Sequence, residues 1–422
     1  MQSVLIKNAR IVDANTDVVS DLFVVNGKIS EMGKKLDKSA DEVIDASGKI
    51  LMPGLFDMHV HFREPGFEYK ETVKTGCDAA IHGGVTGVAC MPNTKPVTDS
   101  KEIIEHIINE SKGTGVKVYP IASTTCGMKG EKLSDYAELK KAGAIAVSDD
   151  GRPVENFKVM REALKKAEAN DMLIISHCED LAIIDGGIMN EGKISRKLGV
   201  KGMDRLSENM ITIREMLLAY ETNTRIHIAH VSTKECVDAI RFAKSKGVKV
   251  TCETAPHYFM LTDEKLLARD ADFRMNPPLR EKADVQAILE GIEDGTIDAV
   301  VTDHAPHAAE EKKDFETAPN GVVGLETSLA ATLTALYHTG KCDLKKICRL
   351  MSDTPRRLLG IEPLNICPGN KAEFILVDPD EEWMVEPEKL HSKSHNTVFK
   401  GMTLKGKVKY VYSDNTLRNL SL

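Results

Sequence analysis

The sequence of 422 residues lacks any long hydrophobic run. No apolar segment approaches the roughly 18–20 residues that cross a membrane, so we expect no transmembrane helix. The first seven residues lack a basic region followed by a long apolar stretch, and they therefore do not predict a signal peptide. Both absences favour a cytoplasmic protein that does not act at a membrane.

Paired cysteines and an excess of positive charge are also missing. The nine cysteines are scattered without a Cys-x-x-Cys pair, which is typical of reduced thiols in a cytoplasm. The formal net charge is -8 at pH 7, whereas a nucleic-acid-binding protein would favour a basic patch. We therefore expect no nucleic-acid partner.

The central part of the sequence alternates apolar strands with amphipathic helices, and capping-box patterns at Asp99-x-x-Glu102 and Ser232-x-x-Glu235 predict two of the helix starts. Eight such repeats favour an α/β fold, a (β/α)₈ TIM barrel. A doubly wound sheet is the alternative, but it would need a glycine-rich phosphate loop after its first strand, and none is present. The predicted strands are residues 55–59, 87–91, 116–121, 144–148, 172–176, 225–229, 249–253 and 299–302.

Both ends of the chain carry short β-strand patterns instead. Near the N-terminus, Asn26-Gly27 between apolar runs predicts a hairpin. Near the C-terminus, strands are predicted at residues 372–377, 396–399 and 408–412. The simplest arrangement is a small β-sandwich domain formed from both termini, so we expect a division into residues 1–52 (β-sandwich, N-terminal part), 53–365 (metal-dependent hydrolase TIM barrel) and 366–422 (β-sandwich, C-terminal part).

Two histidines, His59 and His61, lie two residues apart at the end of an apolar run. A strand places residues i and i+2 on the same face, so both imidazoles can bind one metal ion. Arg63 continues on that face and adds a fixed positive charge beside the metal. A metal ion next to a guanidinium group suggests a substrate that carries a carboxylate.

Potential metal ligands follow five of the eight predicted strands. Because the carboxyl ends of barrel strands converge on one face, these side chains are expected to meet there. Four histidines and two carboxylates can bind two divalent ions that share a bridging carboxylate and lower the pKa of bound water. Neutral imidazole suits zinc best, so the sequence predicts one or two Zn²⁺ ions, with two favoured. The candidate metal ligands are His59 and His61 from the first predicted strand, together with Asp149, Asp150, His177, His230 and Asp303.

Seven motifs in this order give the chain, over essentially its whole length, a resemblance to a known family. It resembles the amidohydrolase superfamily and, within it, the dihydroorotases of the longer, bacterial and archaeal type. The resemblance implies a zinc-dependent enzyme that reversibly cyclises N-carbamoyl-L-aspartate to L-dihydroorotate in de novo pyrimidine (UMP) biosynthesis. The motifs lie at residues 57–66, 91–94, 148–151, 177–179, 229–232, 276–278 and 302–307.

The resemblance also implies a metal-ligand set. His59, His61 and Asp303 would bind the first ion, and His177 and His230 the second. Many amidohydrolases bridge the two ions with a carboxylated lysine at the end of the fourth strand, but here that strand ends in Ser-Asp-Asp without a lysine. An aspartate would take this role. We choose Asp150 over Asp149 because its distance from His177 along the sequence matches the family pattern.

Roles in catalysis and substrate binding follow from the same resemblance. Asp303 would move a proton between the attacking water and the leaving amide nitrogen. Arg63 would bind the substrate carboxylate through two hydrogen bonds. The remaining expected substrate contacts are His61, Asn93, Asn276, His307, Asn320 and Gly321.

Two other functions are compatible with the sequence. One is a different cyclic amidohydrolase, such as an allantoinase or a hydantoinase, but these enzymes handle substrates without the carboxylate that would explain Arg63. The other is a catalytically inactive relative that serves as a scaffold for a transcarbamoylase, although such relatives typically lose metal ligands that this chain keeps. Aspartate transcarbamoylase and a second copy of the chain are the protein partners that these considerations leave open.

Overall fold

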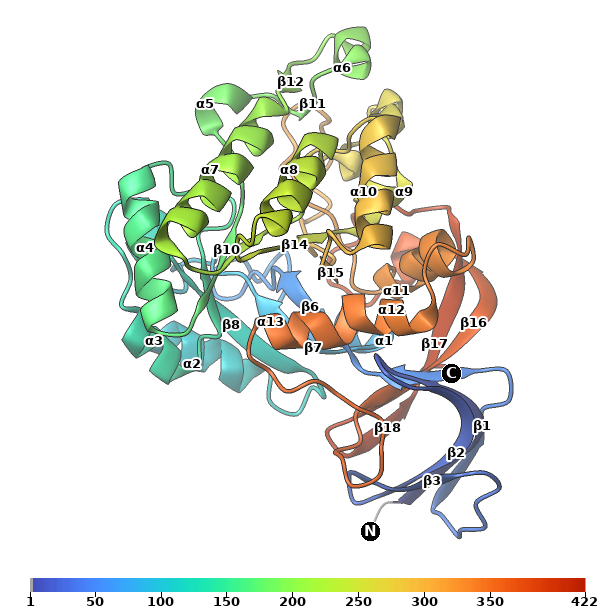
Figure 1. Ribbon diagram of the computed structural model, residues 1–422. Coiled ribbons are helices and arrows are strands. Elements are labelled where there is room, and N and C mark those ends of the chain that lie inside the picture. The colour runs from blue at the N-terminus through green and yellow to red at the C-terminus, as the bar shows by residue number, and fades with distance from the viewer. Residues whose placement is uncertain (1–2, 422) are drawn as a thin grey trace.

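The structure, a computed structural model, describes residues 3–421 and consists of a barrel and a sheet domain (Figure 1). The eight barrel strands are parallel and neighbour each other in the order in which they occur along the chain. This confirms the predicted TIM barrel, and the predicted strand ends are correct to within two residues. The strands are β6 (Leu55–Val60), β7 (Val85–Cys90), β8 (Lys117–Ser123), β9 (Ala146–Ser148), β10 (Leu173–Ser176), β13 (Ile226–Ile228), β14 (Val250–Thr254) and β15 (Ala299–Val300).

The barrel closes between its first and last strands, just where the first candidate ligands lie. The backbone N–H of His61 donates to the carbonyl of His304 at 2.8 Å. The Thr302 N–H donates to the Asp57 carboxylate at 3.0 Å, and the same carboxylate accepts from the His59 N–H at 3.0 Å. Asp57 therefore joins the two strand ends, and burial raises its pKa to about 7.

Helices cover the outside of the barrel. Among them α4, α7, α8 and α10 follow one another around its outer surface (Figure 1). Their buried apolar side chains and those of the strands form the largest hydrophobic core of the protein. The helices are α1 (Val73–His82), α2 (Lys101–Glu110), α3 (Tyr136–Ala142), α4 (Phe157–Ala169), α5 (Leu181–Ile184), α6 (Lys193–Leu198), α7 (Leu206–Thr222), α8 (Lys234–Ser245), α9 (Pro256–Met260), α10 (Lys282–Asp294), α11 (Ser328–Thr332), α12 (Leu344–Cys348) and α13 (Thr354–Leu358).

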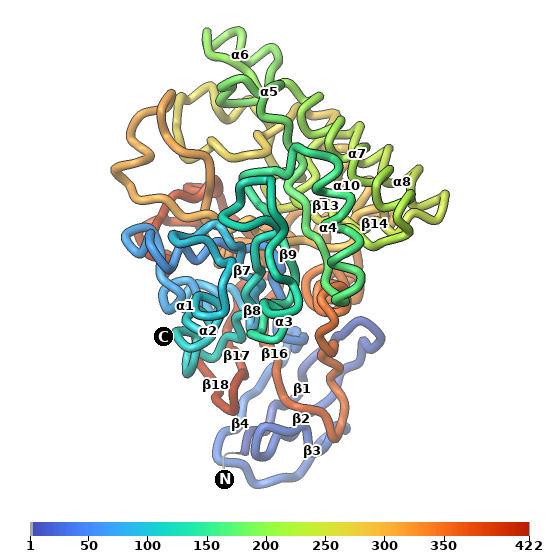
Figure 2. Tube along the Cα trace, turned by 90° about the vertical axis from the view of Figure 1, so that its left-hand side faces the viewer, coloured from blue at the N-terminus to red at the C-terminus, as the bar shows by residue number. Residues whose placement is uncertain are grey.

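Strands from both ends of the chain form one mixed sheet in the order β18-β17-β16-β5-β1-β2-β3, with β4 also paired to β1. Figure 2 shows this sheet at the base of the molecule, below the barrel. The antiparallel pair β5–β16 joins the N-terminal strands to the C-terminal ones. The sheet strands are β1 (Ser3–Val12), β2 (Asp17–Val25), β3 (Lys28–Gly33), β4 (Glu42–Asp45), β5 (Ile50–Pro53), β16 (Phe374–Met384), β17 (Thr403–Ser413) and β18 (Thr416–Asn419), and a separate small pair is β11 (Met189–Asn190) with β12 (Gly202–Met203).

Some local predictions are wrong. Residues 396–399 were predicted to form a strand, but they form a loop and a turn. Their apolar side chains Val398 and Phe399 are buried in a hydrophobic core without joining a sheet. Neither predicted capping box begins its helix: the N-caps are one residue later, at Ser100 and Thr233. Among residues 3–421, no helix is long and apolar enough to cross a membrane.

Candidate metal centre

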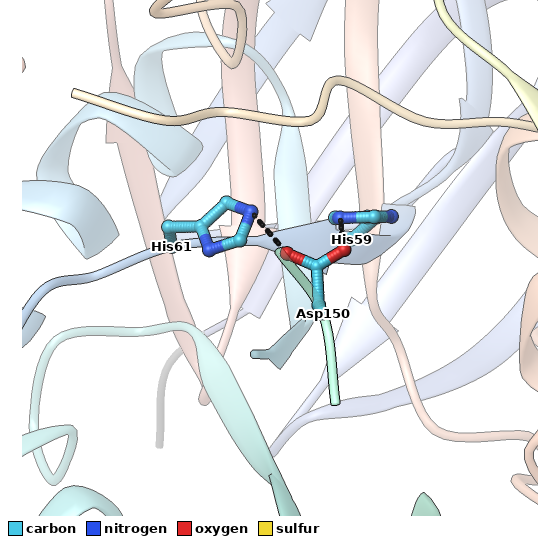
Figure 3. A group of neighbouring side chains, drawn as sticks. All are labelled: His59, His61 and Asp150. Carbon is cyan, nitrogen blue, oxygen red and sulfur yellow. Dashed lines mark ion pairs between the residues drawn. The ribbon is translucent and has the colours of Figure 1, made fainter. Parts of the chain in front are cut away.

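The structure brings four histidines and Asp150 together at the carboxyl end of the barrel. Figure 3 shows His59, His61 and Asp150 of this cluster. Asp150 Oδ1 lies 3.5 Å from His59 Nε2, and Asp150 Oδ2 lies 3.5 Å from His61 Nε2. Asp150 Oδ1 also lies 3.4 Å from His177 Nδ1 and 3.7 Å from His230 Nε2. His59 and His61 therefore form one group of potential ligands with Asp150, and His177 and His230 form a second group with the same carboxylate.

Several atoms in this cluster are buried without a hydrogen-bond partner. They include His59 Nε2 and Asp150 Oδ1, which face each other. A buried polar atom without a partner costs free energy, and a bound cation would satisfy both of these atoms at once. The donor set of imidazole nitrogens and carboxylate oxygens also suits zinc, so the residues present fit the implied metal.

Three of the imidazole rings are held by hydrogen bonds at one ring nitrogen, and their other ring nitrogen faces the cluster. His59 Nδ1 lies 2.6 Å from Glu253 Oε1, and His61 Nδ1 lies 2.8 Å from Asn93 Oδ1. His177 Nε2 lies 3.0 Å from a carboxylate oxygen of Glu179. Because these oxygens only accept, each outer nitrogen carries a proton, and when the ring is neutral the inner nitrogen presents its lone pair to the cluster.

The two adjacent aspartates after β9 have different surroundings. Asp149 turns away from the cluster and accepts hydrogen bonds from the Thr125 N–H at 3.1 Å and from the Thr125 hydroxyl. Burial raises the pKa of Asp149 to about 6. Asp150 is also buried, but the adjacent imidazoles of His177, His230 and His59 hold its pKa well below the usual range. Asp150 is thus the carboxylate at the centre of the cluster.

Asp303 lies beside the same cluster. Its Oδ1 is 3.1 Å from His61 Nε2 and 3.5 Å from His59 Nε2. Burial disfavours its charge, but the hydrogen bond from His61 and the nearby His59 lower the pKa of Asp303 overall. The carboxylate is therefore ionised at neutral pH and can accept a proton at this position.

Arg63 reaches the site by a turn of the backbone. The prediction that it continues on the face of the strand is wrong, because β6 ends at Val60 and Arg63 has φ 64°. Its Nε donates to the Pro306 carbonyl at 3.1 Å, and its Nη2 lies 3.4 Å from His307 Nε2. Burial lowers the pKa of Arg63, while Asp303 and Asp150 raise it, so the guanidinium lies within the field of the cluster.

Other residues that were predicted to contact the substrate lie near Arg63 and the histidine cluster. His307 Nε2 is 2.9 Å from the Asn320 carbonyl, and a Cβ on Gly321 would come within 2.9 Å of the His307 ring. Burial, together with Arg63 and other nearby cations, lowers the pKa of His307 to about 2, so its ring is neutral. Asn276 Nδ2 donates to Glu179 Oε1 at 2.7 Å. Asn276 is thus linked to His177 through one carboxylate.

Further residues contact the candidate ligands and substrate-binding residues but were not predicted from the sequence. Glu253 is fully buried between His59 and His227, and burial raises its pKa while these two histidines lower it to about 2 overall. Glu179 was visible within the motif at 177–179 but was given no role. Lys70 was also missed, and its Nζ lies 3.1 Å from His307 Nδ1 on the Arg63 side of the site.

Solved structures with the same fold are cyclic-amide hydrolases. The L-hydantoinase (dihydropyrimidinase) from Arthrobacter aurescens is 25% identical, with a TM-score of 0.88 over 99% of this chain and 96% of that one. The dihydropyrimidinase from Brevibacillus agri NCHU1002 is 22% identical, with a TM-score of 0.85 over 99% of this chain and 95% of that one. The second likeness shows the fold alone.

A parallel barrel with a histidine and carboxylate cluster at its carboxyl end defines this chain as a cyclic-amide hydrolase of the metal-dependent class. Residues 48–236 match the family model described as dihydro-orotase-like. The chain is 49% identical to the dihydroorotase of Geotalea daltonii over 98% of both chains, and 47% identical to that of Acetivibrio thermocellus over 96% of both. The chain belongs to the dihydroorotase family.

Proposed function

We propose that the protein is a dihydroorotase, which reversibly closes N-carbamoyl-L-aspartate to L-dihydroorotate in pyrimidine biosynthesis. The observation that carries this proposal is the combination of a five-residue metal-ligand cluster with the guanidinium of Arg63 at the same end of one barrel. A metal cluster of this kind can support the hydrolysis of any cyclic amide and does not by itself identify the substrate. Arg63 favours a substrate with a carboxylate, and of the candidate substrates dihydroorotate has one while hydantoin and allantoin do not.

The proposed metal site holds two zinc ions. His59, His61 and Asp303 would hold the first, His177 and His230 the second, and Asp150 would bridge them. When bound, the ions would polarise the amide carbonyl and make water more acidic. The shared position of Asp150 and its partnerless Oδ1 support this assignment.

Asp303 would carry the proton in both directions. In ring opening, water adds to the ring carbonyl, the carbon–nitrogen bond breaks, and Asp303 transfers a proton from the water to the departing nitrogen. The product carries one more ionised carboxylate than the substrate, so ring opening releases one proton and ring closure consumes one. Low pH therefore favours dihydroorotate, and high pH favours carbamoyl aspartate.

The substrate carboxylate would be bound by Arg63, with Asn93, Asn276 and His307 as further polar contacts. A neutral His307 offers a hydrogen bond without a second positive charge. Asn320 and Gly321 would contribute from the loop that approaches His307. Both reactions use the carboxylate that stays intact, so these contacts serve closure and opening alike.

We also place this reaction in the cytoplasm, an assignment supported by nine cysteines that are all free thiols. A transcarbamoylase acting on aspartate would supply the substrate. Its physical association with this chain is a separate prediction, and co-sedimentation of the two purified enzymes would test it.

A substrate panel tests the proposed function. The zinc-loaded protein should interconvert carbamoyl aspartate and dihydroorotate, and it should turn over hydantoin, allantoin and dihydrouracil far more slowly. Raising the pH should shift the equilibrium towards carbamoyl aspartate. Faster turnover of hydantoin or allantoin than of dihydroorotate would instead assign the protein to another cyclic amidohydrolase, and no turnover of any of them would support the inactive scaffold.

A further inference from the structure

Lys70 is a nearly buried cation in the loop between β6 and α1, and the proposed mechanism gives it no role. Its side chain is 12% exposed, and its Nζ lies 2.9 Å from Glu311 Oε1. The same Nζ lies 3.1 Å from Nδ1 of His307. The Lys70 carbonyl accepts from the Ser394 hydroxyl at 2.7 Å, which holds the backbone at this position. Lys70 is therefore fixed against an imidazole that is expected to bind the substrate.

The hydrogen bond between Lys70 and His307 can have only one direction. The ion pair with Glu311 favours the charged amine, and an ammonium group has three donors and no acceptor. His307 Nδ1 therefore accepts. Burial, together with Arg63 and Lys70, lowers the pKa of His307 to about 2, so its ring carries a single proton. That proton lies on Nε2.

The surroundings of Nε2 specify the same tautomer independently. His307 Nε2 lies 2.9 Å from the Asn320 carbonyl oxygen, which only accepts, so the nitrogen donates. Arg63 Nη2 lies 3.4 Å from the same nitrogen. An N–H group cannot donate to a ring nitrogen that already carries a proton, so the N–H groups of Arg63 Nη2 stay available to another acceptor.

We propose that Lys70 is a specificity-determining residue that acts through His307: by fixing the tautomer, it makes this side of the site purely a hydrogen-bond donor for the substrate carboxylate. The proposal rests on the proposed function, in which Arg63 and His307 bind that carboxylate. A carboxylate only accepts hydrogen bonds. In the other tautomer the Nε2 lone pair would face the carboxylate and would also accept from Arg63, so the substrate would lose two donors.

Kinetics of a variant without the lysine test this role. Lys70→Met removes the donor, and only the Asn320 carbonyl then favours a proton on Nε2. The KM for dihydroorotate should rise about 10-fold, the size of one charged hydrogen bond. The value of kcat should change little, because no group of the metal cluster is altered. Dihydrouracil has no carboxylate, so its KM should stay unchanged.

Two further variants separate the donor from the fold. Lys70→Arg also presents only donors and should keep a KM close to that of the wild type. Lys74→Met is the matched control, because the Lys74 side chain is 67% exposed on α1 and pairs with Glu110 at 2.9 Å. This variant removes a nearby lysine without touching His307, so kcat and KM should both stay at their wild-type values.

Nitrogen NMR of the zinc-loaded protein with isotopically labelled histidine reads the tautomer directly and needs no substrate. Protonated and unprotonated ring nitrogens resonate far apart, and the signals that His307→Gln lacks identify His307. In the wild type Nε2 should be protonated and Nδ1 should not. Lys70→Met should move the two signals towards each other, because exchange between the tautomers averages them. Lys70→Arg should keep the wild-type pattern.

Two NMR results would overturn the proposal. One is a wild-type His307 that is protonated at Nδ1. The other is a Lys70→Met variant that keeps the pure wild-type tautomer, since a higher KM would then reflect only the lost charge of Lys70. An equal rise of the KM for dihydrouracil would also contradict it. Because the tautomer is read without substrate, failure of this proposal is distinguishable from failure of the proposed function, which the substrate panel tests on the wild type.

Discussion

The buried carboxylates of Glu373 and Asp150 lie at opposite ends of the barrel, and they differ in their hydrogen-bond partners. At the amino end, near the terminal sheet, Glu373 Oε1 accepts from the Thr86 hydroxyl at 2.8 Å and from Arg356 at 3.2 Å. Its other oxygen pairs with Lys371 at 2.8 Å. At the carboxyl end, Asp150 Oδ1 is surrounded by imidazole nitrogens and has no hydrogen-bond partner.

This difference distinguishes a structural ion pair, at Glu373, from a ligand-binding site, at Asp150. Both Glu373 and Asp150 are buried carboxylates with lowered pKa values, so burial and charge alone do not distinguish them. They differ in whether neighbouring side chains supply a hydrogen-bond partner to each carboxylate oxygen without a ligand. The contrast predicts that removing Asp150 abolishes chemistry, whereas altering Glu373 reduces stability.

The largest effect is expected at the proposed metal bridge. Asp150→Ala should lose bound metal and reduce dihydroorotase activity by more than about 10⁴-fold, because the ions supply most of the electrophilic activation. Asp149→Ala should retain metal, since Asp149 bonds to Thr125 outside the cluster. Elemental analysis of both purified variants decides between them. Full metal occupancy in Asp150→Ala would refute the assignment.

Asp303→Asn should give the next largest effect. The amide cannot accept a proton, so turnover should fall by roughly 10²–10⁴ in both directions. Some metal loss can accompany the change, because Asp303 Oδ1 lies 3.1 Å from His61 Nε2. Steady-state kinetics on protein reloaded with zinc separates the two effects. Normal turnover by the metal-replete variant would exclude the proton-transfer role.

Loss of the Arg63 guanidinium should affect only substrates with the carboxylate. Arg63→Met should lower kcat/KM for carbamoyl aspartate and dihydroorotate by about 10- to 150-fold, the size of a charged bidentate contact. Arg63→Lys keeps the charge without the fork and should recover only part of the loss. Dihydrouracil lacks the carboxylate and serves as the control. An equal loss on dihydrouracil would mean that Arg63 supports the fold instead.

The smallest effect on activity is expected at the amino end of the barrel. Glu373→Gln should leave Arg356 buried without its counter-charge and cost about 3–5 kcal/mol of stability, which lowers the melting temperature by roughly 5 °C or more. The zinc content and kcat of the folded variant should match the wild type. Calorimetry and kinetics on the same sample measure both. A large loss of kcat without a lower melting temperature would remove the distinction between the two ends.

The sequence predicted the barrel because its strands carry strong local patterns. His59, His177 and Asp303 follow directly after such strands or lie within them, so their convergence could be inferred without coordinates. The roles of the individual site residues stay predictions.

Other features depend on contacts that no local pattern encodes. Glu253 meets His59 from a strand almost two hundred residues later, and the left-handed backbone of Arg63 (φ 64°) has no sequence signature. The predicted start of α8 is one residue too early because Ser232 donates its hydroxyl to Glu208, and Thr233 caps the helix.

The most direct test of the metal-centred account is to titrate zinc into chelated wild-type protein while measuring zinc content and dihydroorotate opening together. The account predicts no turnover in the metal-free protein and a rise in activity that reaches its plateau at two bound zinc ions per chain. A plateau at one ion would contradict the two-ion site bridged by Asp150. Full turnover by the metal-free protein would contradict the account as a whole.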